Sequence, residues 1–323
     1  MMAGPPGDPV PVILDTDIGT DIDDIWALAM LLRSPELDLK LVATVSGDTT
    51  YRAQLVAATL SAAGRDDVPI AIGPATKLPD GGPDVFRGQT QAGLAAGVDL
   101  DLHRGGVRRD GVEALVEAVM ASEDQVTVIA IGPMTNLAAA LALEPRIVEK
   151  AKVVAMLGSI HAGFKDAPDP ELEYNVIVDV DACQAVLAAD WEVTITPLDT
   201  CGSVALEGDR YAAIRDSDDP LMRLVVGSFR EWDGNLASAW EEIDSSFYYA
   251  GMSERESTVL FDTVAVYLAY DESLLSVETL PLMVADDGET RISPGAPEAR
   301  LAMSWRQRED FLDHLTDRLL GRC

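Results

Sequence analysis

Short apolar runs of strand length alternate with longer apolar or amphipathic runs of helical length over the first two hundred residues. This β-then-α rhythm is typical of a parallel sheet wound with helices on both faces. The strands predicted by the pattern span residues 11–14, 39–45, 68–72, 125–131, 152–157 and 192–196. The helices predicted between these strands span residues 25–32, 51–63, 112–120, 134–143 and 180–188.

The pattern changes in two regions. Residues 73–109 are rich in Gly and Pro and read as a loop too long for a simple connector. After about residue 205 the chain becomes mainly helical up to residue 270, with late strands near 275–282 and 300–303 and a final helix at 306–320. The expected fold class is therefore α/β, a mainly parallel central sheet flanked by helices with a helical C-terminal portion.

Domain organisation follows from what separates these elements. We find no linker rich in Gly, Ser or charge and no internal repeat, so residues 11–323 are expected to form a single domain. Residues 1–10, with several Gly and Pro, are expected to form a disordered tail. No apolar run approaches the roughly 20 residues of a membrane span, and no signal peptide is evident.

The composition indicates which classes of partner and which cellular location to expect. The net charge of −31 repels phosphate backbones and anionic lipid, which argues against nucleic acid and membranes as partners. Cations and neutral small molecules are compatible with this charge, most of which we interpret as a solvated acidic surface. The three cysteines form no CxxC pair and no zinc pattern, so a reduced, cytoplasmic location is expected.

A cluster of aspartates follows the first predicted strand. Asp15 and Asp17 come where that strand ends, Asp21 follows in the loop, and Asp23 and Asp24 come where the first helix begins. Ligands of open α/β sheets bind beyond the carboxyl ends of the strands. Carboxylates this close repel one another unless a cation neutralises them, and hard divalent cations prefer oxygen ligands. The cluster therefore predicts a divalent-cation site and a catalytic centre.

Three other interpretations explain less of the cluster. The spacing begins like a calcium-binding EF-hand loop, but the sixth position from Asp15 is Thr20 instead of Gly and the twelfth is Trp26 instead of Glu. Haloacid-dehalogenase-type phosphatases also carry D-x-D after a strand, but their downstream Lys and further acidic motif are not convincingly present. Helix capping by Asp23 and Asp24 accounts for only two of the five aspartates.

Five segments resemble, in the right order, the landmarks of the nucleoside hydrolase family of the inosine-uridine-preferring type. The aspartate cluster followed by Ala27-Leu28 resembles D-x-D-x-G-x-D-D-x-x-A-[LI], with the two extra residues Asp21-Ile22 as in a divergent member. The other four segments are Ile131-Gly132-Pro133-Met134-Thr135-Asn136-Leu137-Ala138, Met156-Leu157-Gly158, Glu173-Tyr174-Asn175 and Phe261-Asp262-Thr263-Val264-Ala265-Val266.

The resemblance implies a nucleoside-hydrolase-like fold and an N-glycosyl hydrolase that uses Ca²⁺ to release ribose and a base from a ribonucleoside. It implies that Asp17 is a calcium ligand and the general base for the attacking water. Asp24, Asp262 and the backbone carbonyl of Ile131 would complete the protein ligands of the metal. Family members are often dimers or tetramers, so a homo-oligomer is expected.

The implied sugar-binding half of the site is largely kept. Asp23 would hold the 2′- and 3′-hydroxyls of ribose, and Glu173 and Asn175 would bind other sugar oxygens. The family's G-N after the second strand reads Gly47-Asp48 here, so a carboxylate replaces a sugar-binding amide. We expect Asp48 to bind substrate and to favour a cationic substrate or a different pattern of hydroxyls.

The leaving-group half departs from the family pattern. Phe261 stands where many purine-active members have a proton-donating His, and Arg87-Gly88 replaces an H-G segment. Of the three histidines, only His161 follows a landmark closely enough to be expected as a contact of the leaving group. Four aromatic residues of the helical region could stack on a base or belong to the core, namely Trp232, Trp240, Tyr248 and Tyr249.

The substrate stays open at this point. One alternative is a hydrolase of another N-glycoside or of a modified nucleoside. The other is a non-catalytic ribose- or nucleoside-binding protein that kept the metal site.

Overall fold

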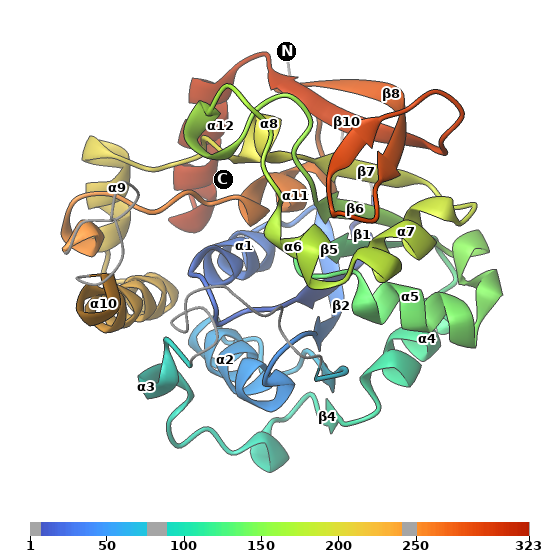
Figure 1. Cartoon of the computed structure of the whole chain (residues 1–323). Coiled ribbons are helices and arrows are strands. Elements are labelled where there is room, and N and C mark those ends of the chain that lie inside the picture. Colours follow the sequence, from blue (N-terminus) through green and yellow to red (C-terminus); the bar gives the residue numbers. More distant parts are fainter. Residues whose placement is uncertain (1–7, 76–88, 241–250, 323) are drawn as a thin grey trace.

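The described part of the chain folds around one continuous ten-stranded sheet with the order β4-β3-β2-β1-β5-β6-β7-β10-β8-β9 (Figure 1). The structure, a computed structural model, describes residues 8–75, 89–240 and 251–322. The strands are β1 Val10–Thr16, β2 Leu37–Thr44, β3 Ile70–Ile72, β4 Val107–Arg108, β5 Val126–Ala130, β6 Ala151–Met156, β7 Val193–Thr196, β8 Leu275–Val284, β9 Thr290–Ile292 and β10 Glu298–Trp305.

The strands from β4 to β7 pair in parallel, and β10 adds to β7 in parallel as well. β8 and β9 complete the edge as antiparallel strands. The central strands are apolar at successive positions because helices cover both faces of the sheet. In β1, Val12 and Leu14 belong to one core and Ile13 to the other, as the two-residue repeat of a strand requires.

Helices cover both faces of the sheet, and each face has its own apolar core. α1, α2, α9, α10, α11 and α12 contribute to one core and α4, α5 and α7 to the other (Figure 1). The helices are α1 Asp23–Leu32, α2 Thr49–Ala62, α3 Ala92–Ala95, α4 Gly111–Ala121, α5 Thr135–Leu143, α6 Tyr174–Val178, α7 Val180–Ala188, α8 Leu198–Cys201, α9 Gly208–Arg215, α10 Pro220–Trp240, α11 Asp262–Leu268 and α12 Arg308–Leu319. Short 3₁₀ turns are η2 Leu100–Leu102, η3 Pro145–Glu149, η4 Phe164–Asp166 and η5 Met252–Glu254.

The predicted fold class and the β-then-α order are confirmed. Helix α7 begins and ends at the predicted residues, and the two late strands are β8 and β10. The pattern missed β4 and β9, which have two and three residues and so carry too few positions for any periodicity. Val10, the last residue of the predicted tail, already belongs to β1. Residues 1–7 lie outside the described part of the chain, so the disordered tail stays a prediction.

Parallel pairing brings the carboxyl ends of β1, β2, β5, β6 and β7 to the same edge of the sheet. The segments that follow these strands therefore meet there, which is where ligands bind in folds of this class. In the part of the chain that the structure describes, no helix is long and apolar enough to cross a membrane.

Candidate active site

The aspartate cluster lies in the loop between β1 and α1. The loop turns sharply at Gly19, whose φ of +107° favours glycine, and a Cβ there would lie 2.5 Å from Cδ1 of Leu55. Thr16, the last residue of β1, donates its hydroxyl to Oδ1 of Asp24 at 2.5 Å and accepts the amide of Ile18 at 3.1 Å. These contacts hold the end of the strand, the loop and the first turn of α1 as one unit.

A cavity of about 400 Å³ opens above this loop. Among the nine residues predicted for the site, the cavity is lined by Asp17, Asp23, Asp24, Ile131, Glu173, Asn175 and Asp262. These residues come from four separate regions of the chain, and the parallel sheet brings them to one place. Asp21, the aspartate of the two-residue extension, lines the same cavity.

Three of the carboxylates form the tightest group. Asp23, Asp24 and Asp262 each offer one oxygen, and these atoms lie within 4.8 Å of one another. The three side chains are buried, and Oδ2 of Asp23 accepts the backbone amide of Asp262 at 3.4 Å. Burial, followed by repulsion among the carboxylates, raises the pKa of all three well above its usual range. Uncompensated charge of this kind suits a divalent cation with oxygen ligands.

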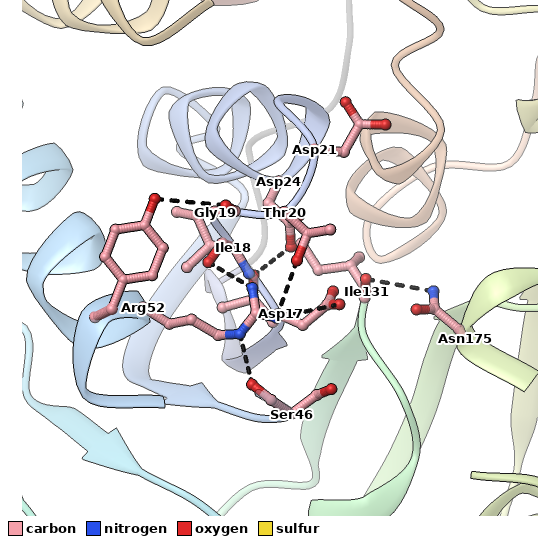
Figure 2. A network of polar contacts seen from close by, with 12 residues as sticks. Asp17, Ile18, Gly19, Thr20, Asp21, Asp24, Ser46, Arg52, Ile131 and Asn175 are labelled. Atoms are coloured by element: carbon pink, nitrogen blue, oxygen red, sulfur yellow. Dashed lines mark hydrogen bonds and ion pairs between the residues drawn. The ribbon is translucent and has the colours of Figure 1, made fainter. Parts of the chain in front are cut away.

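Asp17 faces a buried arginine that the sequence pattern did not single out. Arg52, on α2 and only 3% exposed, lies with Nη2 3.9 Å from Oδ2 of Asp17. The same guanidinium donates to the carbonyls of Ser46 at 2.6 Å and Ile18 at 2.8 Å, and to Oγ1 of Thr20 at 3.0 Å. Figure 2 shows Arg52 reaching into the loop that carries the aspartates.

Arg52 therefore has two effects on the site. Its donors tie the loop after β1 to the loop after β2, which gives Asp17 a defined position. Burial raises the pKa of Asp17, and the positive charge of Arg52 opposes that rise. The available signal in the sequence was that Arg52 is the only charged residue of α2, because an Arg that is buried must find partners.

A second buried contact supports the loop from behind. Asn136, in the first turn of α5, donates to Oδ1 of Asp15 at 2.6 Å and to the carbonyl of Thr44 at 3.2 Å. Asp15 lies in β1 and does not line the cavity. Burial raises the pKa of Asp15 to about 7, against the opposing hydrogen bond from Asn136. Asn136 thus links β1, β2 and α5 beneath the site.

Glu173 and Asn175 enter the cavity at the start of α6. The Glu173 carboxylate caps this helix and accepts the backbone amides of Asn175 at 2.8 Å, Gly158 at 3.0 Å and Val176 at 3.2 Å. Burial raises the pKa of Glu173 to about 7, although these amides oppose the rise. Asn175 donates Nδ2 to the carbonyl of Met156 at 3.2 Å. It also donates Nδ2 to the carbonyl of Ile131 at 3.4 Å (Figure 2), and the two contacts fix the orientation of its amide.

The other two predicted residues do not line this cavity. Asp48 caps α2, accepting the amide of Tyr51 at 3.0 Å, and its other oxygen accepts from Nε2 of Gln89 at 3.0 Å. His161 is exposed and lines a neighbouring pocket that shares Glu171 and Leu172 with the cavity. The roles in substrate binding predicted for Asp48 and His161 stay predictions.

Three of the described residues that line the cavity are aromatic, namely Phe164, Tyr174 and Phe261. The rings of Phe164 and Phe261 have their centroids 5.9 Å apart, with an angle of 35° between the ring planes. Trp232 is buried in the core and donates Nε1 to the carbonyl of Thr20 at 3.1 Å. The side chain of Trp240, and Tyr248 and Tyr249 altogether, lie outside the described residues.

The chain is similar to known proteins over most of its length. Residues 12–309 match the family model described as inosine-uridine preferring nucleoside hydrolase. The protein of that name from Crithidia fasciculata is 30% identical over 294 residues, which is 87% of this chain and 85% of that protein. The non-specific ribonucleoside hydrolase RihC of Klebsiella pneumoniae is 30% identical over 206 residues, 64% of this chain and 66% of RihC.

Solved structures agree with the fold. A plant nucleoside hydrolase, PpNRh1, superposes with a TM-score of 0.77 at 23% identity, covering 96% of this chain and 99% of that one. The family match begins within β1, continues past the end of β10 and includes every residue that lines the cavity. The chain therefore belongs to the inosine-uridine preferring nucleoside hydrolase family, a family of N-glycosyl hydrolases.

Proposed function

We propose that this chain is a calcium-dependent hydrolase of the N-glycosidic bond of a ribonucleoside, releasing ribose and a base. One observation carries the proposal: buried carboxylates from β1–α1 and α11 meet polar groups of α6 in a single cavity. Family membership supports the reaction class, and the cavity supports the division of the site into a metal side and a sugar side.

The metal side would use Asp17, Asp24, Asp262 and the backbone carbonyl of Ile131. All four residues line the cavity and offer the oxygen ligands that Ca²⁺ prefers. The close approach of Asp24 and Asp262 supports this assignment, because two buried anions so near each other need a positive charge between them. When bound, Ca²⁺ would favour deprotonation of water and hold the ribose hydroxyls in place.

Asp17 is the proposed general base. Its carboxylate would accept a proton from the attacking water, while Arg52 keeps its position relative to the loop. The contact with Arg52 also favours the ionised form of Asp17, which is the form that a base requires. Gly132 supports this geometry, because a Cβ there would lie 2.9 Å from the backbone nitrogen of Asp17.

The sugar side would use Asp23, Glu173 and Asn175. Carboxylates in these positions accept hydrogen bonds from ribose hydroxyls, and the Asn175 amide, held by two carbonyls, has a fixed direction. As the bond to the base stretches, C1′ develops positive charge. The surrounding carboxylates stabilise that charge without having to reorganise.

The test is a reducing-sugar assay over purine, pyrimidine and nicotinamide ribosides, with Ca²⁺ or with a chelator. We expect ribose release that depends on Ca²⁺. Replacing the proposed base by Asp17→Asn should lower kcat by about 10²–10⁴-fold. Asp209→Asn is the matched control, because Asp209 is an exposed residue of α9 outside the cavity.

Two results would contradict the proposal. Full activity of the Asp17→Asn variant would remove Asp17 as the base. Thermal stabilisation of the protein by ribose, without release of reducing sugar from any riboside, would instead indicate a binding protein.

A further inference from the structure

Acidic side chains line much of the cavity. Seven carboxylates line it, from Asp17, Asp21, Asp23, Asp24, Glu171, Glu173 and Asp262, and the described lining residues include no Lys, Arg or His. A bound divalent cation and the neighbouring Arg52 would offset only part of this charge. The field of such a cavity attracts a cationic substrate more strongly than a neutral one of the same shape.

No histidine reaches the cavity. All three histidines of the chain are described, and each lies elsewhere. His103 contacts the carbonyl of Val68 at 2.7 Å, His314 contacts the hydroxyl of Tyr270 at 2.7 Å, and His161 lines the neighbouring pocket. The position directly before Asp262 belongs to Phe261, which lines the cavity with an apolar ring.

Phe164 and Phe261 offer aromatic surface on the same cavity. The face of an aromatic ring attracts a cation, and an aromatic cation can also stack on it. Nζ of Lys165 lies 5.4 Å from the ring centroid of Phe164, so that ring already contacts a cation, whereas Phe261 and Tyr174 offer the cavity further aromatic surface. The aromatic pair therefore suits a flat, positively charged ring.

The chemistry of the leaving group connects these observations. A neutral base attached through nitrogen leaves as an anion unless it receives a proton, which general acids such as His supply. A pyridinium nitrogen instead takes the bonding pair as the C1′–N bond breaks and leaves as a neutral pyridine. The oxygen of water then bonds to C1′ and its proton passes to Asp17, so no proton donor is needed for the departing ring.

We infer that the site prefers ribosides whose leaving group is a cationic aromatic ring, of the N-ribosylpyridinium class. This inference rests on the proposed function and adds the substrate class to it. Among the observations behind it, the absence of histidine, the Phe164–Phe261 pair and the two carboxylates of Asp21 and Glu171 have no role in the proposed sugar and metal contacts.

The experiment compares kcat/KM for nicotinamide riboside with that for its reduced dihydropyridine form, for uridine and for inosine, all with Ca²⁺. The reduced form has the same ring skeleton without the positive charge. We expect nicotinamide riboside to be preferred by about tenfold or more over each neutral riboside. Equal or faster hydrolysis of inosine or uridine would overturn the inference and leave the proposed function intact.

Two variants, Glu171→Gln and Phe261→His, separate the effect of the negative charge of the cavity from the effect of a missing proton donor. Glu171→Gln removes one exposed carboxylate of the cavity and should lower the preference about threefold, whereas Glu113→Gln, on the exposed side of α4, should not change it. Phe261→His should raise the kcat for inosine relative to that for nicotinamide riboside. If both variants retain the wild-type Tm and leave the preference unchanged, the inference is wrong.

A complete lack of ribose release from every riboside would be a different result. It would refute the proposed function first, and the preference for a cationic leaving group with it. Product analysis by chromatography identifies the released ring in each case.

Discussion

At the scale of single residues, the site depends on buried charges that each have a defined partner. Arg52 is the clearest case, because one guanidinium contacts two carbonyls, one hydroxyl and one carboxylate while almost fully buried. The planar guanidinium has enough donors in fixed directions to bind all four acceptors, whereas the ammonium of a Lys cannot reproduce this geometry. Arg52 is therefore a positioning residue for Asp17 in the proposed reaction.

The Arg52→Lys variant keeps the positive charge and loses the planar guanidinium group. We expect kcat to fall by about 10²-fold with a smaller change in KM, because Asp17 loses its defined position while the sugar contacts remain. Steady-state kinetics at saturating Ca²⁺ measures this split, with Arg104→Lys on the exposed surface as the control. An unchanged kcat would show that Arg52 serves the fold alone.

His314, which does not line the cavity, should make the stability of the fold depend on pH. Burial, together with repulsion from Arg318, lowers the pKa of His314 below 6.5, although Glu36 and Asp271 oppose this. Below about pH 6.5 the unfolded chain takes up a proton that the folded chain resists, so the free energy of unfolding falls as pH falls.

The His314→Gln variant lacks this titration. Between pH 8 and pH 5, urea unfolding should show the wild type losing stability relative to the variant, with most of the change below pH 6.5. Parallel stability curves for the two proteins would contradict the lowered pKa.

At the scale of elements, capped helix N-termini position residues of the site. Asp48 caps α2, which carries Arg52, and Glu173 caps α6, which carries Asn175. In both cases a carboxylate satisfies amides that the first turn of a helix leaves without partners. Residues that look like substrate contacts in the sequence can therefore owe their position to capping.

The capping role of Asp48 can be tested apart from its predicted role in substrate binding. Asp48→Ala should destabilise the protein by about 1 kcal/mol, whereas Asp48→Asn, which also caps, should change stability by only a few tenths. Denaturant unfolding measures both. If Asp48→Asn keeps its stability but changes the preference among ribosides, Asp48 also contacts substrate; an unchanged preference would leave capping as its role.

At the scale of the whole molecule, the cavity links metal binding to folding. Asp24 and Asp262 are separated by most of the sequence, and only the folded chain brings their carboxylates together. A cation that binds the folded state alone stabilises it by mass action.

Ca²⁺ at one hundred times its Kd should therefore stabilise the protein by about 2.7 kcal/mol. A chelator should lower the Tm, and Asp262→Asn should abolish the difference between the two conditions. Asp209→Asn, which changes an exposed residue, should retain the full difference. A Tm that Ca²⁺ does not change would contradict the proposed metal site.

The sequence by itself determined the local structure and the chemistry that neighbouring residues carry. The two-residue and helical periodicities predicted the order of strands and helices, because burial on both faces of a sheet leaves a direct pattern in the chain. The aspartate cluster could also be recognised in the sequence, because its members lie within ten residues of one another. The order of the five motifs along the chain was sufficient to indicate the family.

Only the tertiary structure decided which distant residues support this chemistry. The contacts of Arg52 with Asp17, of Asn136 with Asp15 and of Phe164 with Phe261 join segments between 35 and 121 residues apart. Local periodicity carries no information about such pairs. They form because parallel pairing of the strands brings the loops after them to one edge of the sheet, where buried charges must meet partners and aromatic rings can share one cavity.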